Sequence, residues 1–204
     1  MPHTLVTGAN SFVAAHIIGE LITEGHTVTG TVRRTSAGES LVAEHPEWAG
    51  KLDFAVVEDY ASEGAFDAIF QAKAYDYIIH VAAPLFGPDA IDYDKDYLRP
   101  GVVGNLSLLK GAKAHAPTLK SVVITGSINS ITDGSPEENR ARDYTNESWN
   151  PITPELARGG SNYAMYQSSK KEAELAVWDF VKTEKPHFAV SHFCIPPSGI
   201  HGTC

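Results

Sequence analysis

The chain has 204 residues, of which 43% are hydrophobic and 20% are charged, and its net charge at pH 7 is −9. This length suits one well-buried domain, and the acidic balance argues against a general affinity for nucleic acid or anionic membranes. No apolar run is long enough to span a bilayer, and the first residues lack the charged and apolar regions of a secretory signal. Two cysteines do not make a disulfide framework, so we expect an intracellular, cytosolic protein.

The first half of the chain alternates between short β-branched runs and amphipathic segments. A helix with Ala14 and Ile18 on its apolar face is predicted after the first run, and Gly25 is predicted to end it. Two further helices are predicted at residues 39–45, which Pro46 ends, and at residues 63–72. The predicted strands of this half are residues 3–7, 26–32 and 51–57.

The same alternation continues to the end of the chain, with predicted strands at residues 76–81, 119–125 and 187–195. Residues 89–114 are mostly helical, with an interruption at Pro100 and Gly101. The polar residues 132–162 are predicted to form a loop, and the next helix runs to about residue 183. Alternating strands and helices indicate right-handed βαβ units. We therefore predict a single α/β domain over residues 1–204, with helices on both faces of a parallel sheet.

A glycine-containing turn, from Thr7 to Ala14, lies between the first strand and the first helix. In an open parallel sheet this turn binds a dinucleotide pyrophosphate on backbone N–H groups and the helix N-terminus. The glycine fingerprint is incomplete, because Gly8 is present but Ser11 stands where a second glycine is expected. A plain strand–helix turn is the alternative interpretation.

Two arginines, Arg33 and Arg34, follow the second strand, and no acidic residue occurs between His26 and Ala37. A carboxylate at this position would bind the ribose hydroxyl of NAD, whereas an arginine suits the 2′-phosphate of NADP. The alternative is a solvated surface pair. Asp59, after the third strand, would reach the adenine edge or form a turn.

Tyr166 and Lys170 lie one turn apart and share one face of the helix that carries them. An ammonium beside a phenol favours the phenolate, so we expect Lys170 to lower the pKa of Tyr166. Ser127 follows the fifth strand, where its hydroxyl would polarise a substrate carbonyl while Tyr166 protonates the developing alkoxide. The alternatives are a solvated tyrosine and, for Ser127, a helix cap or turn residue.

The nine histidines show no metal-ligand spacing, and we expect no metal site. His187 and His192 both fall on the predicted sixth strand with opposite parity, so they are expected to face different ways. His201 with Cys204 is too sparse for zinc. The chain has no Gly-x-Ser-x-Gly elbow, which argues against a hydrolase.

Several short segments together resemble an extended short-chain dehydrogenase/reductase, most closely the dihydroflavonol 4-reductase-like group with its plant flavonoid and fungal ketone reductases. The order and spacing of these segments carry the resemblance. They are residues 5–9 (Leu-Val-Thr-Gly-Ala), 31–33 (Thr-Val-Arg), 64–67 (Gly-Ala-Phe-Asp), 79–84 (Ile-His-Val-Ala-Ala-Pro), 123–127 (Val-Ile-Thr-Gly-Ser), Tyr166 with Lys170, and 197–202 (Pro-Ser-Gly-Ile-His-Gly).

The resemblance implies a Rossmann-type doubly wound sheet and a hydride transfer from NADPH to a ketone or aldehyde. Tyr166 would be the general acid, Lys170 would lower its pKa and bind the nicotinamide ribose, and Ser127 would hold the carbonyl oxygen. The implied cofactor-binding residues are Gly8, Asn10, Ser11, Phe12 and Val13 at the pyrophosphate, Arg33 at the 2′-phosphate, Asp59 and Tyr60 at the adenine, Val81, Ala82, Ala83 and Thr125 near the ribose, Tyr166 and Lys170, and Pro197 and Ser198 at the nicotinamide.

The chain departs from the pattern of that family in three places. Ser11 and Ala14 replace glycines of the phosphate turn, and Gly126 stands where the family usually has a second serine. Family members also continue past the last matching segment into a C-terminal substrate domain, whereas this chain stops at Cys204. That domain, which is expected to be largely absent here, would cover the nicotinamide and exclude water.

The leading hypothesis is an NADPH-dependent carbonyl reductase that acts on a small molecule. A sugar-nucleotide epimerase or dehydratase that recycles its cofactor is an alternative within the same fold, and a non-catalytic, shortened nucleotide-binding or interaction module is an alternative from another class. The long helices near residues 102–114 and 172–182 would pair across a homodimer or simply cover the sheet.

Overall fold

The computed structural model describes residues 1–83, 90–133 and 142–195. Within them lies one sheet of six parallel strands in the order β3-β2-β1-β4-β5-β6. The strands are β1 His3–Thr7, β2 Thr27–Val32, β3 Leu52–Val56, β4 Tyr77–His80, β5 Ser121–Ser127 and β6 Ala189–Ile195. This arrangement confirms the predicted doubly wound fold. The predictions at Pro197 and Ser198 lie outside the described residues.

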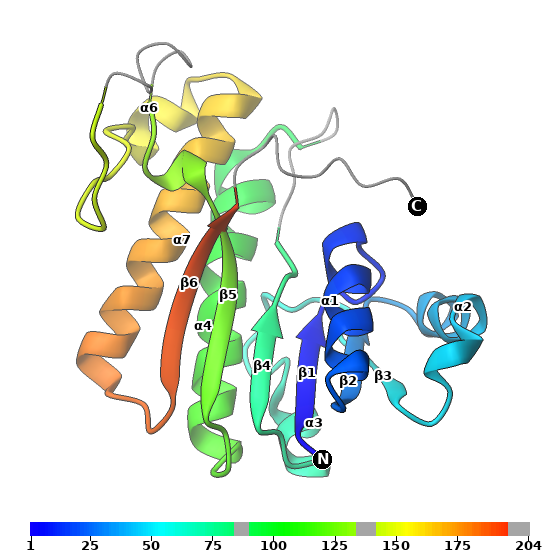
Figure 1. Cartoon of the computed structure of the whole chain (residues 1–204). Coiled ribbons are helices and arrows are strands. Elements are labelled where there is room, and N and C mark those ends of the chain that lie inside the picture. The colour runs from blue at the N-terminus through cyan, green and yellow to red at the C-terminus, as the bar shows by residue number, and fades with distance from the viewer. Residues whose placement is uncertain (84–89, 134–141, 196–204) are drawn as a thin grey trace.

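The two halves of the sheet grow outward from β1, which pairs with β2 on one side and β4 on the other. The chain therefore changes direction between β1 and β4, and all strands end at the same edge (Figure 1). In an open parallel sheet, a change of this kind opens a crevice at the carboxyl ends of the strands. Thr7 at the end of β1 lies opposite His80 at the end of β4.

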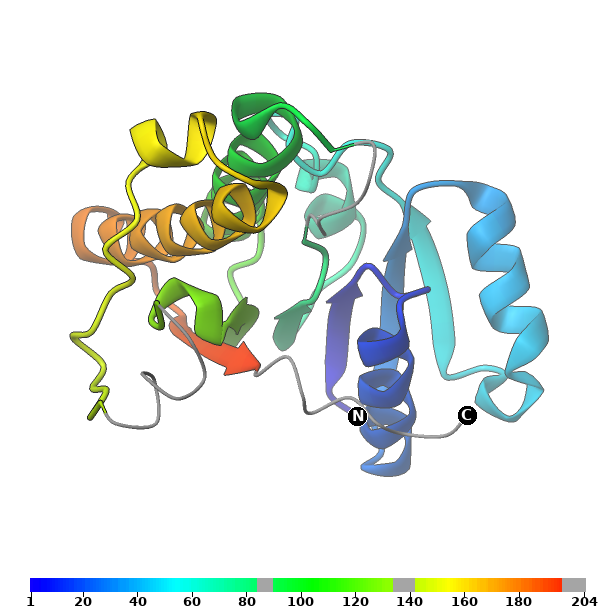
Figure 2. The ribbon, with the colours of Figure 1, turned by 90° about the horizontal axis from the view of Figure 1, so that it is seen from above.

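Helices cover the two faces of the sheet unequally (Figure 2). One face carries α1 Phe12–Thr23 and α2 Thr35–Glu44, and the other carries α3 Asp67–Ala72, α4 Arg99–His115 and α7 Asn162–Glu184. Shorter helical segments are the 3-10 turns Pro46–Trp48 and Ile128–Ser130, the π-helix Tyr93–Leu98 and α6 Pro154–Arg158. None of the described helices is long and apolar enough to cross a membrane.

The side chains of β1 point alternately to the two faces of the sheet, and both faces are buried, which explains the continuous apolar run in its sequence. Leu5 belongs to the core under α3, α4 and α7, whereas its neighbour Val6 belongs to the core under α1 and α2, and both are fully buried. Successive side chains of a strand point to opposite faces, so both faces of a central strand must be apolar. β6 lies at the edge of the sheet, and its Phe193 is 64% exposed.

Three predicted elements differ from the structure for local reasons. Pro100 lies directly after the junction between the π-helix Tyr93–Leu98 and α4, so the chain stays helical through Pro100 and Gly101 and changes only its helix type beside them. The helix predicted from residue 63 begins only at Asp67, because Gly64 adopts a positive φ of 69°. Within the predicted loop of residues 132–162, Thr153 caps the short helix α6.

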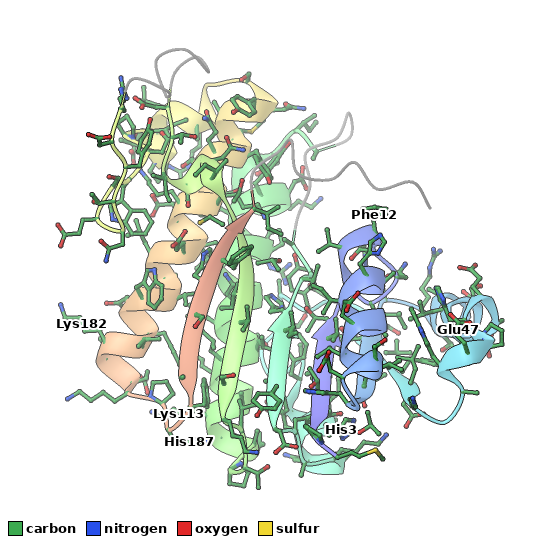
Figure 3. All side chains as sticks on the ribbon, in the orientation of Figure 1. His3, Phe12, Glu47, Lys113, Lys182 and His187 are labelled. Atoms are coloured by element: carbon green, nitrogen blue, oxygen red, sulfur yellow. The ribbon has the colours of Figure 1, made fainter. Side chains whose placement is uncertain are left out.

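His187 lies before β6 rather than on it, so the predicted parity between His187 and His192 was wrong. Its ring Nε2 donates a hydrogen bond to the Ala116 carbonyl at 3.0 Å. The ring therefore joins the start of β6 to the end of α4, at the opposite end of the sheet from the crevice (Figure 3).

Candidate cofactor and active site

The turn after β1 brings the backbone of two strands into close contact. Gly8 has a φ of 65°, and a Cβ atom placed on it would lie 3.1 Å from the Ala82 Cα. Only glycine combines this conformation with this proximity. The N–H of Ala9 donates to the Thr31 carbonyl at 2.9 Å, which ties the same turn to β2.

The first turn of α1 is open to an anionic ligand. Ser11 is its N-cap residue but makes no side-chain capping bond, and no acidic residue lies in the first turn. Phe12, partly exposed at the start of α1, lies on the side of the sheet where the strands end (Figure 3). Unpaired N–H groups and the helix dipole favour a negatively charged group at this position.

Thr7 organises the segment that follows β4. Its hydroxyl oxygen accepts hydrogen bonds from the N–H groups of Val81 and Ala82, each at 3.0 Å, and lies 2.7 Å from Nδ1 of His80. Burial lowers the pKa of His80 to about 3, so the ring is neutral and Nδ1 accepts the hydroxyl proton. The resulting network fixes the chain from Val81 to Ala83 beside Gly8.

A cavity of about 610 Å³ runs along the ends of β1, β2 and β4. It contains ten of the predicted cofactor-binding residues, which are Gly8, Asn10, Ser11, Phe12, Val13, Arg33, Tyr60, Val81, Ala82 and Ala83. Thr31, Val32 and Val57 complete its wall. Residues predicted from the ends of three separate strands therefore line one continuous cavity.

Arg33 and Arg34 are exposed at the edge of this cavity, and both line an adjoining hollow of about 790 Å³. Three other arginines, Arg99, Arg142 and Arg158, pair with aspartates. Neither Arg33 nor Arg34 forms an ion pair with any residue that the structure describes. Their guanidinium groups are therefore available to an external anion such as a phosphate.

Asp59 does not line the cavity, although the family resemblance implied an adenine contact. Its carboxylate accepts hydrogen bonds from the Ala61 N–H at 2.9 Å, the Ser62 hydroxyl at 3.0 Å and Arg99 at 2.9 Å. These contacts hold the pKa of Asp59 below its ordinary value, Arg99 being the largest cause. This is the turn-forming role that the sequence left open. Its neighbour Tyr60 does face the cavity, and burial raises the pKa of Tyr60 to about 12.

Tyr166, Lys170 and Ser127 come together where α7 crosses the end of β5. The Nζ atom of Lys170 lies 5.3 Å from the centre of the Tyr166 ring. Ser127 is hydrogen-bonded to Tyr166, and its Oγ also accepts the N–H of Asn129 at 3.2 Å. The serine therefore has the capping role considered from sequence, and its predicted role at a substrate carbonyl stays a prediction.

The expected lowering of the pKa of Tyr166 by Lys170 is not found in the structure. Burial raises the pKa of Tyr166 and outweighs the opposing hydrogen bond from Ser127. Burial also lowers the pKa of Lys170 from 10.5 to about 8. The Nζ atom of Lys170 lies over the Tyr166 ring. In the chain alone the phenol is therefore neutral at pH 7, whereas Lys170 is still mostly charged but loses its proton more easily than an ordinary lysine.

A second, small cavity of about 20 Å³ lies beside Lys170 and Thr125, and Ala82 and Ala83 line both cavities. Lys170 and Thr125 thus adjoin the larger hollow, and Tyr166 lies beside Lys170 on α7. Sequence reasoning did not predict Asn105 or His192, which line the small cavity. No short motif marks either residue, because each reaches the cavity only through the packing of α4 or β6.

Residues 4–185 match the profile of the family described as the NAD dependent epimerase/dehydratase family. This chain belongs to that family. The match covers the whole stretch from β1 to the end of α7, and it confirms the resemblance inferred from the short segments. The Gly8 turn, the Ser127–Tyr166 pair and Lys170 are therefore positioned on a sheet of the epimerase/dehydratase type.

Curated proteins that resemble the chain include two fungal reductases. Ketoreductase azaE of Aspergillus niger is 36% identical over 90% of this chain and 53% of its own length. The NADPH-dependent methylglyoxal reductase GRE2 of Saccharomyces cerevisiae is 32% identical over 97% of this chain and 58% of its own length. The chain thus spans just over half the length of the curated relatives it matches.

A solved structure of a similar protein shares the fold closely. The crystal structure of Gre2 in complex with NADPH from Candida albicans has a TM-score of 0.86 and 29% identity, over 96% of this chain and 58% of that chain. The similarity extends over nearly all of the sheet and helices described above.

Proposed function

We propose that this chain carries the cofactor-binding and proton-donating parts of an NADPH-dependent reductase of ketones or aldehydes. One observation carries the proposal: the cavity that begins at the unpaired Arg33 and the small cavity beside Lys170 share Ala82 and Ala83 as a common wall. A dinucleotide bound along this line would have its phosphate-bearing end at Arg33 and its nicotinamide end near Tyr166. The names of the fungal relatives, which include an NADPH-dependent reductase and a ketoreductase, support the same activity.

The residues present fit the cofactor at three points. Gly8 and the uncapped first turn of α1 offer backbone N–H groups to a pyrophosphate. Arg33, which has no ion-pair partner among the described residues, offers a planar guanidinium to a 2′-phosphate. Lys170 would bind the ribose hydroxyls of the nicotinamide half, and Pro197 and Ser198, which lie outside the described residues, would edge the nicotinamide.

When bound, NADPH supplies the hydride for carbonyl reduction. Ser127 would donate a hydrogen bond to the carbonyl oxygen, and Tyr166 would transfer its hydroxyl proton to that oxygen as negative charge develops. A buried tyrosine with a raised pKa is protonated at neutral pH, which is the state a proton donor requires. Lys170, when protonated, would stabilise the phenolate that remains.

The absence of an acidic residue at the end of β2 favours a reductase that exchanges NADPH over an epimerase that retains NAD. The two activities differ in how the cofactor behaves, since a recycling enzyme holds it through purification. A chain that copurifies with tightly bound NAD would contradict the reductase assignment.

The proposal is tested by titrating the purified 204-residue chain with NADPH and with NADH while following nicotinamide fluorescence. Binding of NADPH at least about ten-fold tighter than NADH, followed by oxidation of NADPH with a panel of ketones and aldehydes, is the expected result. Equal affinity for both cofactors would contradict the proposed binding of the 2′-phosphate by Arg33. Binding without turnover on any carbonyl would favour a nucleotide-binding module instead.

Two long helices also offer a surface for a homodimer. Val103 of α4 and Leu175 and Trp178 of α7 are large apolar residues that are each more than a third exposed. We include a homodimer through these helices in the proposal, and sedimentation equilibrium of the wild type and of Trp178→Glu tests it. A monomeric wild type would contradict it.

A further inference from the structure

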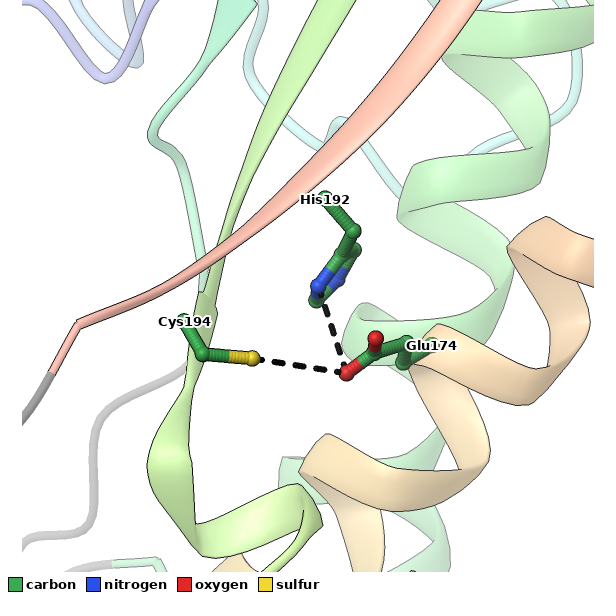
Figure 4. Close-up of side chains that lie close together, drawn as sticks. All are labelled: Glu174, His192 and Cys194. Atoms are coloured by element: carbon green, nitrogen blue, oxygen red, sulfur yellow. Dashed lines mark hydrogen bonds and ion pairs between the residues drawn. The ribbon is translucent and has the colours of Figure 1, made fainter. Parts of the chain in front are cut away.

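We propose that Glu174, His192 and Cys194 form a binding site for Zn²⁺ between α7 and β6. The carboxylate comes from α7, and the imidazole and thiol come from alternate positions of β6, so both β6 side chains face the helix (Figure 4). The three donor atoms lie within 4.8 Å of one another. The proposal is independent of the reductase function, since none of these residues was assigned a role in carbonyl reduction.

The spacing of the donor atoms fits a tetrahedral zinc site. Zinc binds sulfur at about 2.3 Å and nitrogen or oxygen at about 2.0–2.2 Å. A tetrahedron with these bond lengths separates nitrogen from oxygen by about 3.4 Å and sulfur from oxygen by about 3.6 Å. The His192 Nδ1 atom lies 3.2 Å from the Glu174 Oε2 atom, and the Cys194 Sγ atom lies 3.8 Å from it.

The site is enclosed, and its carboxylate is held in place by neighbours. The side chain of His192 is 3% exposed and that of Glu174 is 10% exposed. The Ser130 hydroxyl donates to Oε2 of Glu174 at 2.8 Å, and Nε1 of Trp178 donates to Oε1 at 3.3 Å. Partners of this kind orient a metal-binding carboxylate and strengthen the site.

His192 points its Nδ1 atom into the cluster without forming a hydrogen bond there. The atom is buried and lacks a hydrogen-bond partner in the described part of the chain, although Glu174 lies close enough for an ion pair. A neutral imidazole directs a lone pair from such a nitrogen, which suits a metal ion better than a second hydrogen-bond acceptor.

Gly126 creates the space that the ring occupies. A Cβ atom at position 126 would lie 2.1 Å from Cε1 and 2.5 Å from Nδ1 of His192. Any side chain there would push the imidazole out of the cluster. The His192 ring can therefore occupy this interior position on β6 only because Gly126 on β5 has no side chain.

The chemistry of the ligands selects the metal. Thiolate and imidazole ligands favour zinc over magnesium or calcium, which prefer oxygen atoms. The Glu174 carboxylate and a Cys194 thiolate would together balance the charge of Zn²⁺. Charge balance matters because Lys170 lines the same small cavity as His192, and its ammonium would repel a metal site with a net positive charge.

The test uses the reduced, metal-free 204-residue chain, titrated first with Co²⁺ as a coloured substitute and then with Zn²⁺. We expect visible d–d bands of tetrahedral Co²⁺ together with a near-ultraviolet sulfur-to-cobalt charge-transfer band, and loss of both on adding one equivalent of Zn²⁺. Cys194→Ser should lose the charge-transfer band, and His192→Ala should weaken Co²⁺ binding at least about 100-fold. Cys204→Ser and His187→Ala, matched controls, should leave the spectrum unchanged.

A charge-transfer band that survives in Cys194→Ser, or one that disappears in Cys204→Ser, would overturn the proposal, and so would the absence of any tetrahedral Co²⁺ spectrum. Gly126→Ala gives an independent variant, because it removes no ligand but displaces the imidazole. It should weaken Co²⁺ binding about as much as His192→Ala while retaining the wild-type circular dichroism spectrum. Unchanged Co²⁺ affinity in a folded Gly126→Ala chain would equally contradict the site.

Discussion

The ammonium of Lys170 lies 5.3 Å above the ring of Tyr166, one turn earlier on α7. This arrangement gives a favourable cation–π contact but leaves the phenol hydroxyl to its hydrogen bond with Ser127. Burial raises the pKa of the phenol, which keeps Tyr166 protonated, and lowers the pKa of the Lys170 ammonium to about 8, close to neutral pH.

Replacing Tyr166 by phenylalanine should remove the proton donor and leave the cofactor cavity intact. General acid catalysis contributes about 10²–10⁴-fold, so we expect kcat/KM for carbonyl reduction to fall by at least about 100-fold. The affinity for NADPH should change by less than about three-fold. Tyr163→Phe is the matched control, since Tyr163 lies on the same helix and donates its hydroxyl to Asn129 at 2.8 Å. Unchanged turnover in Tyr166→Phe would exclude the proposed mechanism.

Replacing Arg33 by alanine should reduce the preference for NADPH. A hydrogen bond to a charged group contributes about 1.5–3 kcal/mol, so the Kd for NADPH should rise by about ten-fold or more. The Kd for NADH should stay the same, because NADH has no 2′-phosphate. Arg158→Ala is the control, as its guanidinium pairs with Asp94. Equal weakening of both cofactors by Arg33→Ala would point to a general electrostatic effect.

Replacing Gly8 by alanine should destabilise the turn through both its conformation and its contact with Ala82. A positive φ costs a residue with a side chain about 1–2 kcal/mol, and the added methyl group would also press against the Ala82 backbone at 3.1 Å. Gly25 offers a matched control, because its φ of 87° is similar but nothing lies within 4 Å of an added Cβ. Urea unfolding should show a larger loss of stability for Gly8→Ala than for Gly25→Ala. Equal losses of unfolding free energy in the two variants would show that the contact with Ala82 does not contribute to the effect of Gly8→Ala.

Replacing Lys170 by methionine should increase the stability of the chain while impairing its activity. The pKa of Lys170 falls from 10.5 to about 8 on folding, which corresponds to a destabilisation on the order of 3 kcal/mol while the lysine is charged. The unfolded chain binds more protons between pH 8 and 10.5, so the stability of the wild type should rise with pH across this window. Lys170→Met should be more stable at pH 7 and should lose that rise.

Lys182→Met is the control for this prediction, since Lys182 is exposed near the end of the same helix. It should leave the free energy of unfolding and its pH dependence nearly unchanged. A Lys170→Met chain that is less stable than the wild type at pH 7 would show that the ammonium makes favourable contacts that outweigh its desolvation.

Local patterns were enough to predict the sheet and most of the cavity. The β-branched run before Gly8, the helical spacing of Tyr166 and Lys170 and the pair Arg33–Arg34 each depend on residues close in sequence. Hydrophobic periodicity and the conformational freedom of glycine act over a few residues, so such features can be recognised without knowing the rest of the chain. The carboxyl ends of parallel strands share one edge, and this alone placed Ser127 near the predicted cofactor.

Tertiary packing decided the features that depend on distant residues. Arg99, far along the chain, pairs with Asp59 and lowers its pKa, and Tyr166 has a raised pKa because the surrounding elements exclude water from it. His192 joins Glu174 only because Gly126 on the neighbouring strand leaves room for the ring. Burial and contacts between distant residues follow from how whole elements pack, and single-sequence periodicity carries no information about which side chains then meet.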